Sequence, residues 1–373
     1  ARLELGTEVL SRQGRRAEAA LAVEEALAEA EAIGARASVT RALRSLGYLR
    51  HVAGRTAEAR ELIGRAAAAA REMADPRAER IAVEQLGIVA QEEGNLDEAL
   101  ALQQGALAMS RRAADAGGEG NALANLATLH HQQRDLDAAR RLYEEALEVF
   151  RRVGDARLQG ISTGNLAALH LEQGRLPEAE RLYRSALDLA REVGDRWAEA
   201  LGLGNLGICL YLAGTPGARD LYEQALSVSR EVGDGRAEGS VKLSIATLDF
   251  DEARFAEARS LCEELLASPT LAADRQLHGA TRCLLARIVR STGGSLDDAA
   301  TLAREARSLC EEAGDRLETA KCLCELGHVA LARGEDARPL LERVAAIVSE
   351  LGVGPDSELG RFHADLRRAI DAR

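Results

Sequence analysis

Small and apolar residues recur along this chain with a period of 40 residues. Five fragments align position by position, each starting 40 residues after the one before; they begin at Gln13, Ala53, Glu93, Gln133 and Gln173. A period of this length is typical of proteins that stack one supersecondary unit many times. The pattern continues to the end of the chain and predicts nine repeats over residues 1–373.

Two turn signals divide each repeat into two helices. The first stands at Gly14, Gly54, Gly94, Arg134, Gly174, Gly214, Ala253, Gly294 and Gly334. The second reads Ala74-Asp75, Ala114-Asp115, Gly154-Asp155, Gly194-Asp195, Gly233-Asp234, Ala273-Asp274 and Gly314-Asp315. Glycine suits the left-handed residue that ends a helix, and aspartate suits the N-cap of the next helix. Because the connections are short, each repeat is predicted to be a hairpin of two antiparallel helices.

Small residues stand where the two helices of a hairpin have to meet. The first helix carries leucine and then glycine or alanine, as in Leu206-Gly207, and the second carries alanines seven residues apart, as in Ala179 and Ala186. Such residues let the helices approach closely. The space between hairpins is expected to be filled by Tyr143, Tyr183 and Tyr222.

The composition agrees with an all-α class. Aromatic residues are only 3% of the chain, too few for a β-sandwich or barrel, whereas alanine, leucine, glutamate and arginine are strong helix formers. We predict one right-handed α-solenoid over residues 1–373, with a capping helix at about 356–370 after Gly354-Pro355. In such a solenoid only neighbouring hairpins should contact each other.

The repeat resembles the tetratricopeptide repeat. The resemblance is carried by a pair such as Leu166-Ala167, by alanine twelve residues on, and by an aromatic residue one turn later, as in Ala179 and Tyr183. The period is 40 rather than 34, and His130 and His170 replace the mid-helix tyrosine of the consensus. Long repeats of this kind are similar to those of kinesin light chains, Pins-type polarity scaffolds and bacterial regulators of the MalT and AfsR type. The resemblance implies a binding scaffold whose first helices line a concave groove.

No motif with catalytic chemistry stands in the sequence. A P-loop, H-E-x-x-H and G-x-S-x-G are absent, and the glycine-rich run 117–120 follows a helix rather than the strand that a dinucleotide site requires. The six cysteines form no C-x-x-C pair and have no histidine at zinc-ligand spacing, so we expect them in the core. We therefore predict no enzyme, no cofactor, and no catalytic or metal-binding residues.

Charge and hydropathy argue against two further classes of protein, those that bind nucleic acids and those that span a membrane. A net charge of −12 without a basic run argues against nucleic-acid binding, and no apolar run is long enough to span a membrane. Lys242 and Lys321 are the only lysines, which indicates a GC-rich, bacterial source. No signal peptide opens the sequence, which favours the cytoplasm. Because the chain starts at Ala1 inside a helical pattern, we expect a fragment of a longer protein.

Polar residues recur on the first helices, two positions before the glycine or alanine. This ladder consists of Ser45, Gln85, Asn125, Asn165, Asn205 and Ser244. Asparagine is a poor residue for a helix interior, whereas its carboxamide can both donate to and accept from a peptide main chain. The resemblance to the tetratricopeptide repeat also implies peptide binding by this ladder, because asparagine at the matching position contacts bound peptide in related arrays. We predict that the ladder binds an extended peptide.

A second set, four residues past the glycine or alanine, extends the predicted site: His131, Leu171, Tyr211 and Phe250. Gly164 and Gly204 precede two ladder residues, although a glycine inside a helix costs about 1 kcal/mol relative to alanine. We therefore expect an open, apolar groove around repeats five to seven. The alternative is that the glycines let adjacent first helices touch and that the ladder side chains bridge neighbouring repeats.

The sequence thus predicts a non-catalytic scaffold that binds a protein or peptide in its concave groove. The acidic surface favours a partner with basic residues. The alternative is the sensor arm of a larger bacterial signalling protein, an ATPase, kinase or transcription regulator, whose catalytic domain lies outside this sequence.

Overall fold

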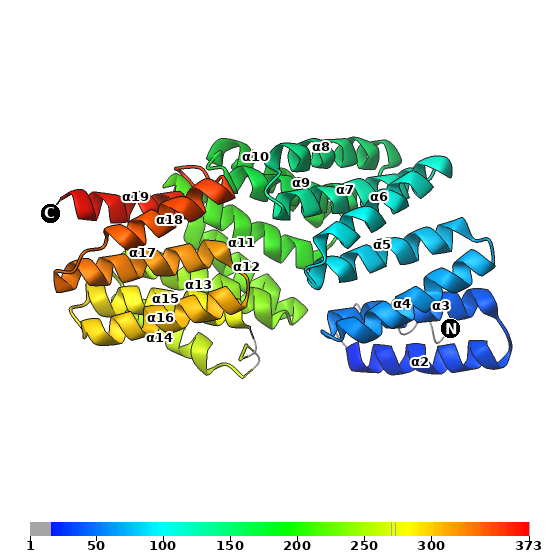
Figure 1. Cartoon of the computed structure of the whole chain (residues 1–373), viewed down its shortest axis with the longest axis horizontal. Helices are drawn as coiled ribbons and strands as arrows, with labels where there is room; N and C mark the ends of the chain where they lie inside the picture. Colours follow the sequence, from blue (N-terminus) through cyan, green and yellow to red (C-terminus); the bar gives the residue numbers. More distant parts are fainter. Residues whose placement is uncertain (1–15, 270, 273, 373) are drawn as a thin grey trace. The chain divides into compact units, whose positions relative to one another are not determined.

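The computed structural model describes residues 16–269, 271–272 and 274–372. These residues form eighteen helices and no strand, which confirms the all-α prediction (Figure 1). In chain order the helices are α2 (Arg16–Ala32), α3 (Arg36–Val52), α4 (Thr56–Glu72), α5 (Pro76–Glu92), α6 (Leu96–Arg112), α7 (Ala116–Gln132), α8 (Leu136–Val153), α9 (Ala156–Glu172), α10 (Leu176–Glu192), α11 (Arg196–Ala213), α12 (Ala218–Val232), α13 (Gly235–Asp251), α14 (Phe255–Ala267), α15 (Arg275–Ser291), α16 (Leu296–Glu312), α17 (Arg316–Arg333), α18 (Arg338–Leu351) and α19 (Glu358–Asp371).

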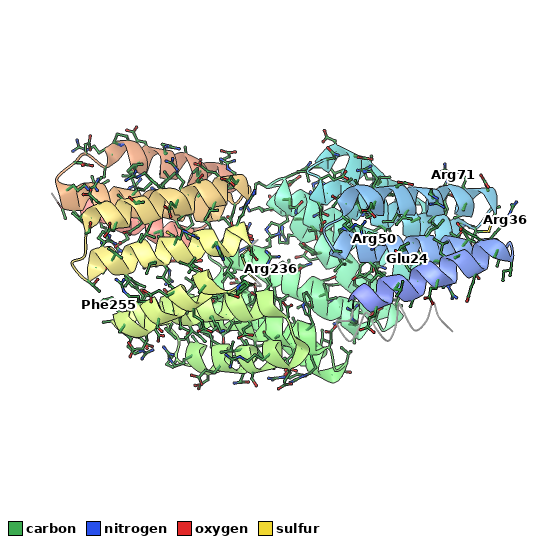
Figure 2. The ribbon with its side chains drawn as sticks, turned by 90° about the horizontal axis from the view of Figure 1, so that it is seen from below. Glu24, Arg36, Arg50, Arg71, Arg236 and Phe255 are labelled. Atoms are coloured by element: carbon green, nitrogen blue, oxygen red, sulfur yellow. The ribbon has the colours of Figure 1, made fainter. Side chains whose placement is uncertain are left out.

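The chain forms two compact units, Ala1–Ser162 and Thr163–Arg373, with the boundary inside α9. The first unit contains the hairpins α3–α4, α5–α6 and α7–α8, and the second contains α11–α12, α13–α14, α15–α16 and α17–α18. Ion pairs join successive helices at the surface, such as Arg50 of α3 with Glu24 of α2 (Figure 2). The expected first turn, at Gly14, lies outside the described residues.

Within the described residues, which do not include the predicted turn residue Ala273, both turn signals have the predicted geometry with one exception. Seven aspartates accept a hydrogen bond of 2.9–3.0 Å from the backbone N–H three residues later; they are Asp75, Asp115, Asp155, Asp195, Asp234, Asp274 and Asp315. The left-handed residue between α15 and α16 is Gly293, with φ +73°, rather than the predicted Gly294. The reason is that Ser295 caps α16, which leaves Gly294 as one extra residue in this turn.

Close packing explains the small residues of the first helices. A Cβ added at Gly207 would lie 2.5 Å from Cε1 of Tyr222, and one added at Gly47 would lie 2.5 Å from Cγ1 of Ile63. Tyr222 is 2% exposed, so it has no room to move away. Tyr143 and Tyr183 are equally buried, as the sequence predicts.

The first helices lie on the inner side of each unit. Each contacts the first helix of the next hairpin, in the pairs α3–α5, α5–α7, α11–α13, α13–α15 and α15–α17. Consecutive second helices, such as α10 and α12, lie farther apart within the described residues. A stack of hairpins that is tighter on one side must curve toward that side, so the first helices provide the concave surface.

One contact in the second unit joins hairpins far apart in sequence. The N–H of Gly354, between α18 and α19, donates a hydrogen bond of 3.1 Å to the carbonyl oxygen of Glu172 at the end of α9. A Cβ at Gly354 would lie 1.9 Å from the carbonyl oxygen of Gln173, so the two backbones touch. The expectation that only neighbouring hairpins contact each other is therefore wrong here, because the connection to the capping helix crosses to the first turn of the unit.

Candidate functional site

All six residues of the predicted polar ladder are half-buried on first helices. Ser45, Gln85 and Asn125 lie on α3, α5 and α7, and Asn165, Asn205 and Ser244 lie on α9, α11 and α13. The two halves of the ladder fall in different units, so each half is considered with its own unit.

The ladder residue Asn125 contacts the second helix of the preceding hairpin. The Nδ2 of Asn125 donates to Oε1 of Gln103, at 3.3 Å, and Gln103 is itself fully buried and donates to the carbonyl oxygen of Glu84. The hydroxyl of Ser244 instead donates to the carbonyl oxygen of Ser240 on its own helix, at 3.2 Å. Asn125 and Gln103 are 22 residues apart, so the ladder position of α7 faces α6. Asn125 thus bridges neighbouring repeats.

At the two glycines beside the ladder an added Cβ would fit without a clash. A Cβ at Gly164 would lie 4.0 Å from Cβ of Ala186, and one at Gly204 would lie 3.7 Å from Cγ2 of Val241. These are ordinary contact distances, in contrast to the 2.5 Å found at Gly207. Neighbouring helices therefore do not require glycine at these two positions, which speaks against the packing explanation for them.

The second predicted set has mixed surroundings. His131 and Leu171 are half-buried, on α7 and α9. The hydroxyl of Tyr211 donates to Asp251, and burial together with this contact raises the pKa of Tyr211. The ring of Phe250 packs edge-on against Phe255, with the centroids 5.5 Å apart.

The expectation of an open, apolar groove around repeats five to seven is wrong at Phe250. The guanidinium of Arg287, on α15, lies 4.4 Å from the ring centroid of Phe250 and 4.8 Å from that of Phe362, on α19. The same cation is 3.7 Å from a carboxylate oxygen of Asp251. The first helices converge here, so one long side chain reaches both neighbours and fills the space between them.

The six cysteines are core residues. Each is buried, as predicted, and burial raises the pKa of the Cys209 thiol to about 11 and those of Cys262 and Cys324 to about 12. Such thiols are protonated and unreactive at neutral pH. No group of three or more metal-ligating side chains occurs in the described part of the chain.

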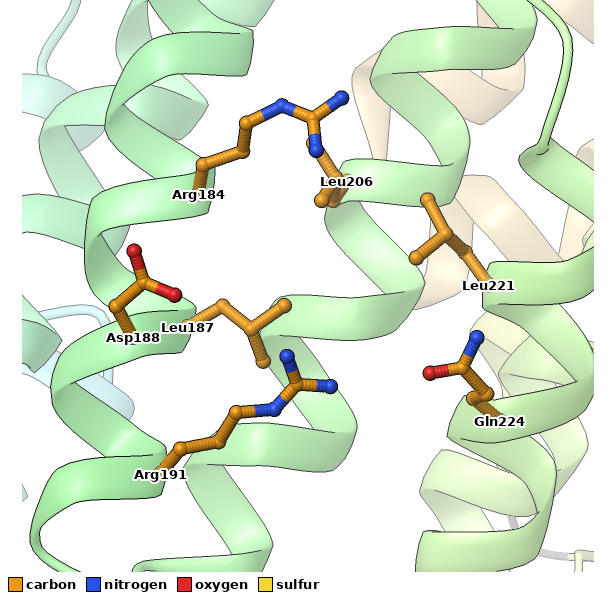
Figure 3. A pocket seen from close by; sticks show the side chains of 7 residues that line it. All are labelled: Arg184, Leu187, Asp188, Arg191, Leu206, Leu221 and Gln224. Atoms are coloured by element: carbon orange, nitrogen blue, oxygen red, sulfur yellow. The ribbon is translucent and has the colours of Figure 1, made fainter.

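A small pocket lies on the outer side of the second unit, between the second helices α10 and α12 (Figure 3). Its lining consists of Arg184, Leu187, Asp188, Arg191, Leu206, Leu221 and Gln224. Arg184 pairs with Glu180 at 2.8 Å and Arg191 with Glu199 at 2.9 Å, so both charges are already balanced. None of the helices in the described residues is long and apolar enough to cross a bilayer.

Curved stacks of helical hairpins with a polar inner face define a class of helical repeat proteins. Residues 78–152 and 158–231 match the sequence profile of the tetratricopeptide repeat. These two stretches thus match the repeat family that the sequence pattern resembles. A search of curated protein sequences finds no match.

Solved structures of this fold match most of the chain. A Rap protein complexed with competence and sporulation factor is 14% identical, with a TM-score of 0.69 over 94% of this chain and 97% of that one. The apo quorum sensor NprR from B. thuringiensis is 16% identical, with a TM-score of 0.62 over 91% and 99%. A signal transduction ATPase with a tetratricopeptide repeat sensor, from Pyrococcus horikoshii, is 16% identical, with a TM-score of 0.59 over 96% of this chain and 55% of that one. At these identities the likeness concerns the fold.

Proposed function

We propose that this protein is a non-catalytic scaffold that binds a peptide or an extended protein segment on the inner face of its first helices. The observation that carries the proposal is that a Cβ would fit at Gly164 and Gly204, so packing does not require the glycines beside Asn165 and Asn205. A ligand backbone can approach closely where a Cβ is missing, and a carboxamide can hydrogen-bond it. The structures of a Rap protein with its factor and of NprR, a quorum sensor, support this proposal.

The partner we propose is a cytoplasmic protein or peptide, not a nucleic acid or a membrane. The net charge of −12 favours partners with basic residues in the first encounter. The alternative function is a sensor arm of a larger bacterial signalling protein. It is supported by the archaeal ATPase, whose match covers 96% of this chain but only 55% of that protein.

The test compares three asparagines at the same repeat position. Peptides are first selected from a random 15-residue library on the immobilised wild-type chain, and their affinities are measured by calorimetry. Asn165→Ala and Asn205→Ala should each weaken binding by about 1–2 kcal/mol, the usual net contribution of one or two hydrogen bonds. Their thermal stability should stay level or rise, because alanine is the better helix former.

Asn125→Ala is the matched control, because it removes the hydrogen bond to Gln103 and should lower the melting temperature. If Asn165→Ala lost stability and kept full affinity, it would bridge repeats as Asn125 does, and the inner face would not be the binding site. Selection of no peptide at all would also contradict the proposal.

A further inference from the structure

Three side chains of the capping helix α19 form one stripe: Glu358, Phe362 and Asp365. They are spaced four and three residues apart, so they lie on the same face of the helix. All three contact side chains of the first helices that precede α19 in the second unit. The stripe is therefore turned toward the surface that the proposed function assigns to a ligand.

The aromatic member of the stripe is held by a cation. Arg287 lies between the rings of Phe362 and Phe250, at 4.8 and 4.4 Å from their centroids. A guanidinium over an aromatic face is attracted by the negative face of the ring, and more strongly away from water. Phe250, one of the predicted site residues, thus shares its cation with the C-terminal helix.

The two carboxylates of the stripe meet two basic side chains of α17. The ammonium of Lys321 is 2.7 Å from Oε2 of Glu358, and Nε2 of His328 is 3.2 Å from Oδ2 of Asp365. Burial alone would lower the pKa of Lys321, but its two carboxylate neighbours, Glu318 and Glu358, outweigh this and raise it. Lys321 is therefore charged, whereas burial lowers the pKa of His328, so at neutral pH its contact with Asp365 joins a carboxylate and a neutral imidazole.

A leucine stripe lies beside the polar one. Leu359 is 2% exposed and Leu366 is fully buried, and both pack into the core formed with α17 and α18. The α18–α19 connection then reaches the end of α9, where Gly354 contacts Glu172, next to the predicted site residue Leu171. Glu358 also adds to the raised pKa of Tyr211, after burial and Asp251. The C-terminal segment thus runs past Leu171, Tyr211 and Phe250.

We propose that α19 occupies, within the same chain, a recognition site for a helix of the same chemistry. The partner would be an amphipathic helix with an aromatic residue between two carboxylates, at positions i, i+4 and i+7, beside a leucine stripe. This mode of recognition lays one apolar face into a groove and lets charges at its edge select the partner. The inference rests on the proposed function and names the partner class for the C-terminal part of the inner face.

Competition follows from this arrangement. A partner helix can bind only when α19 has left, so its apparent affinity is reduced by the fraction of molecules in which the site is free. A variant that weakens the docking of α19 without changing the site should bind the partner more tightly. Phe362→Ala with Leu366→Ala is such a variant, because both side chains belong to α19 and neither belongs to the surface that receives it.

The probe is a fluorescein-labelled peptide with the sequence of residues 356–371, and its binding to the full chain is followed by fluorescence anisotropy. We expect the double variant to bind it at least about tenfold more tightly than the wild-type chain. Adding Arg287→Gln to the double variant should remove this gain. Equal binding by the double variant and the wild type would overturn the proposal.

Matched peptides test what is recognised. The peptide with Phe362→Ala should lose at least about tenfold in affinity, and the peptide with Arg367→Ala, an exposed residue outside the stripe, should bind as the unchanged peptide does. If the Phe362→Ala and Arg367→Ala peptides had the same affinity, the site would not recognise the aromatic and acidic stripe.

A measurement on the wild-type chain needs no variant. Hydrogen exchange should show the amides of α19 opening more readily than those of α17, because a displaceable element belongs to the least stable part of a fold. Equal protection of the two helices would overturn the proposal. The asparagine variants above do not touch α19, so failure of the peptide scaffold and failure of this inference give different results.

Discussion

At the residue scale, the same residue type has different meanings on the same helix face. Gly204 and Gly207 are three residues apart on α11, yet only Gly207 faces a buried ring at a distance that excludes a Cβ. Asn125 likewise has a partner in the preceding hairpin. What distinguishes these positions is the neighbour that lies opposite, not the residue itself.

Alanine substitutions at the two glycines should therefore have opposite effects. Gly204→Ala fits without a clash and should raise the stability of the second unit by about 0.5–1 kcal/mol, because alanine loses less backbone entropy in a helix. Gly207→Ala places a Cβ too close to Tyr222 and should lower the stability of the second unit by about 1–3 kcal/mol. Urea denaturation followed by circular dichroism measures both. Equal effects of the two substitutions would show that the distances around them do not control packing.

At the element scale, the hairpins are defined by their caps. Each Asp N-cap holds a backbone N–H that the helix cannot satisfy itself, and the left-handed residue before it ends the previous helix. Among the described residues, four left-handed residues at helix ends are not glycine, with φ between 52° and 64°: Ala74, Ala114 and Arg134, which precede an aspartate cap, and Ala253, which precedes Arg254. The repeat keeps the turn even where the residue is unfavourable, which shows that packing of the two helices also determines it.

The cap of α5 offers a clean test. Asp75 accepts the N–H of Ala78 at 2.9 Å, and Asp75→Ala should cost about 1 kcal/mol. Asp75→Ser, which keeps a capping oxygen, should recover most of that loss. Thermal unfolding of the two variants beside the wild type gives the comparison. A serine variant as unstable as the alanine variant would mean that the cap is not the cause.

At the scale of each unit, the C-terminal segment is more than an end cap. Leu323 and Cys324 of α17 are fully buried under α18 and α19, and the segment also contacts the end of α9. In an open stack, removal of the last elements would affect only the adjoining hairpin. In this second unit the loss of stability should also extend to the turn at the end of α9, which Gly354 contacts.

Deletion of residues 335–373 should therefore destabilise the second unit, including residues near Glu172, and leave residues 16–162 unchanged. Hydrogen exchange followed by mass spectrometry resolves the two regions. The shorter deletion of 372–373 serves as the control and should change neither. Unchanged protection around residues 172–174 in the long deletion would contradict a role for the Gly354 contact.

Much of this protein follows from its sequence. The period, the caps and the small residues determined the hairpins, their bounds to within a few residues, and the burial of the tyrosines and cysteines, because these depend on contacts within one repeat or between neighbours. The likeness to the tetratricopeptide repeat followed from the same local pattern, and residues 78–152 and 158–231 match the profile of that repeat. The assignment of the ten predicted site residues to a ligand stays a prediction.

Only the tertiary structure decided how the inner face of the second unit is filled. The contacts of Arg287 with two rings and of Gly354 with Glu172 join residues separated by 37 to 182 positions. The contacts of Arg287 with Phe362 and of Gly354 with Glu172 skip at least one hairpin, so they depend on the curvature that accumulates over several hairpins, which no single repeat encodes. The stripe of Glu358, Phe362 and Asp365 was visible in the sequence, but its basic partners lie on other helices, and only folding brought them together.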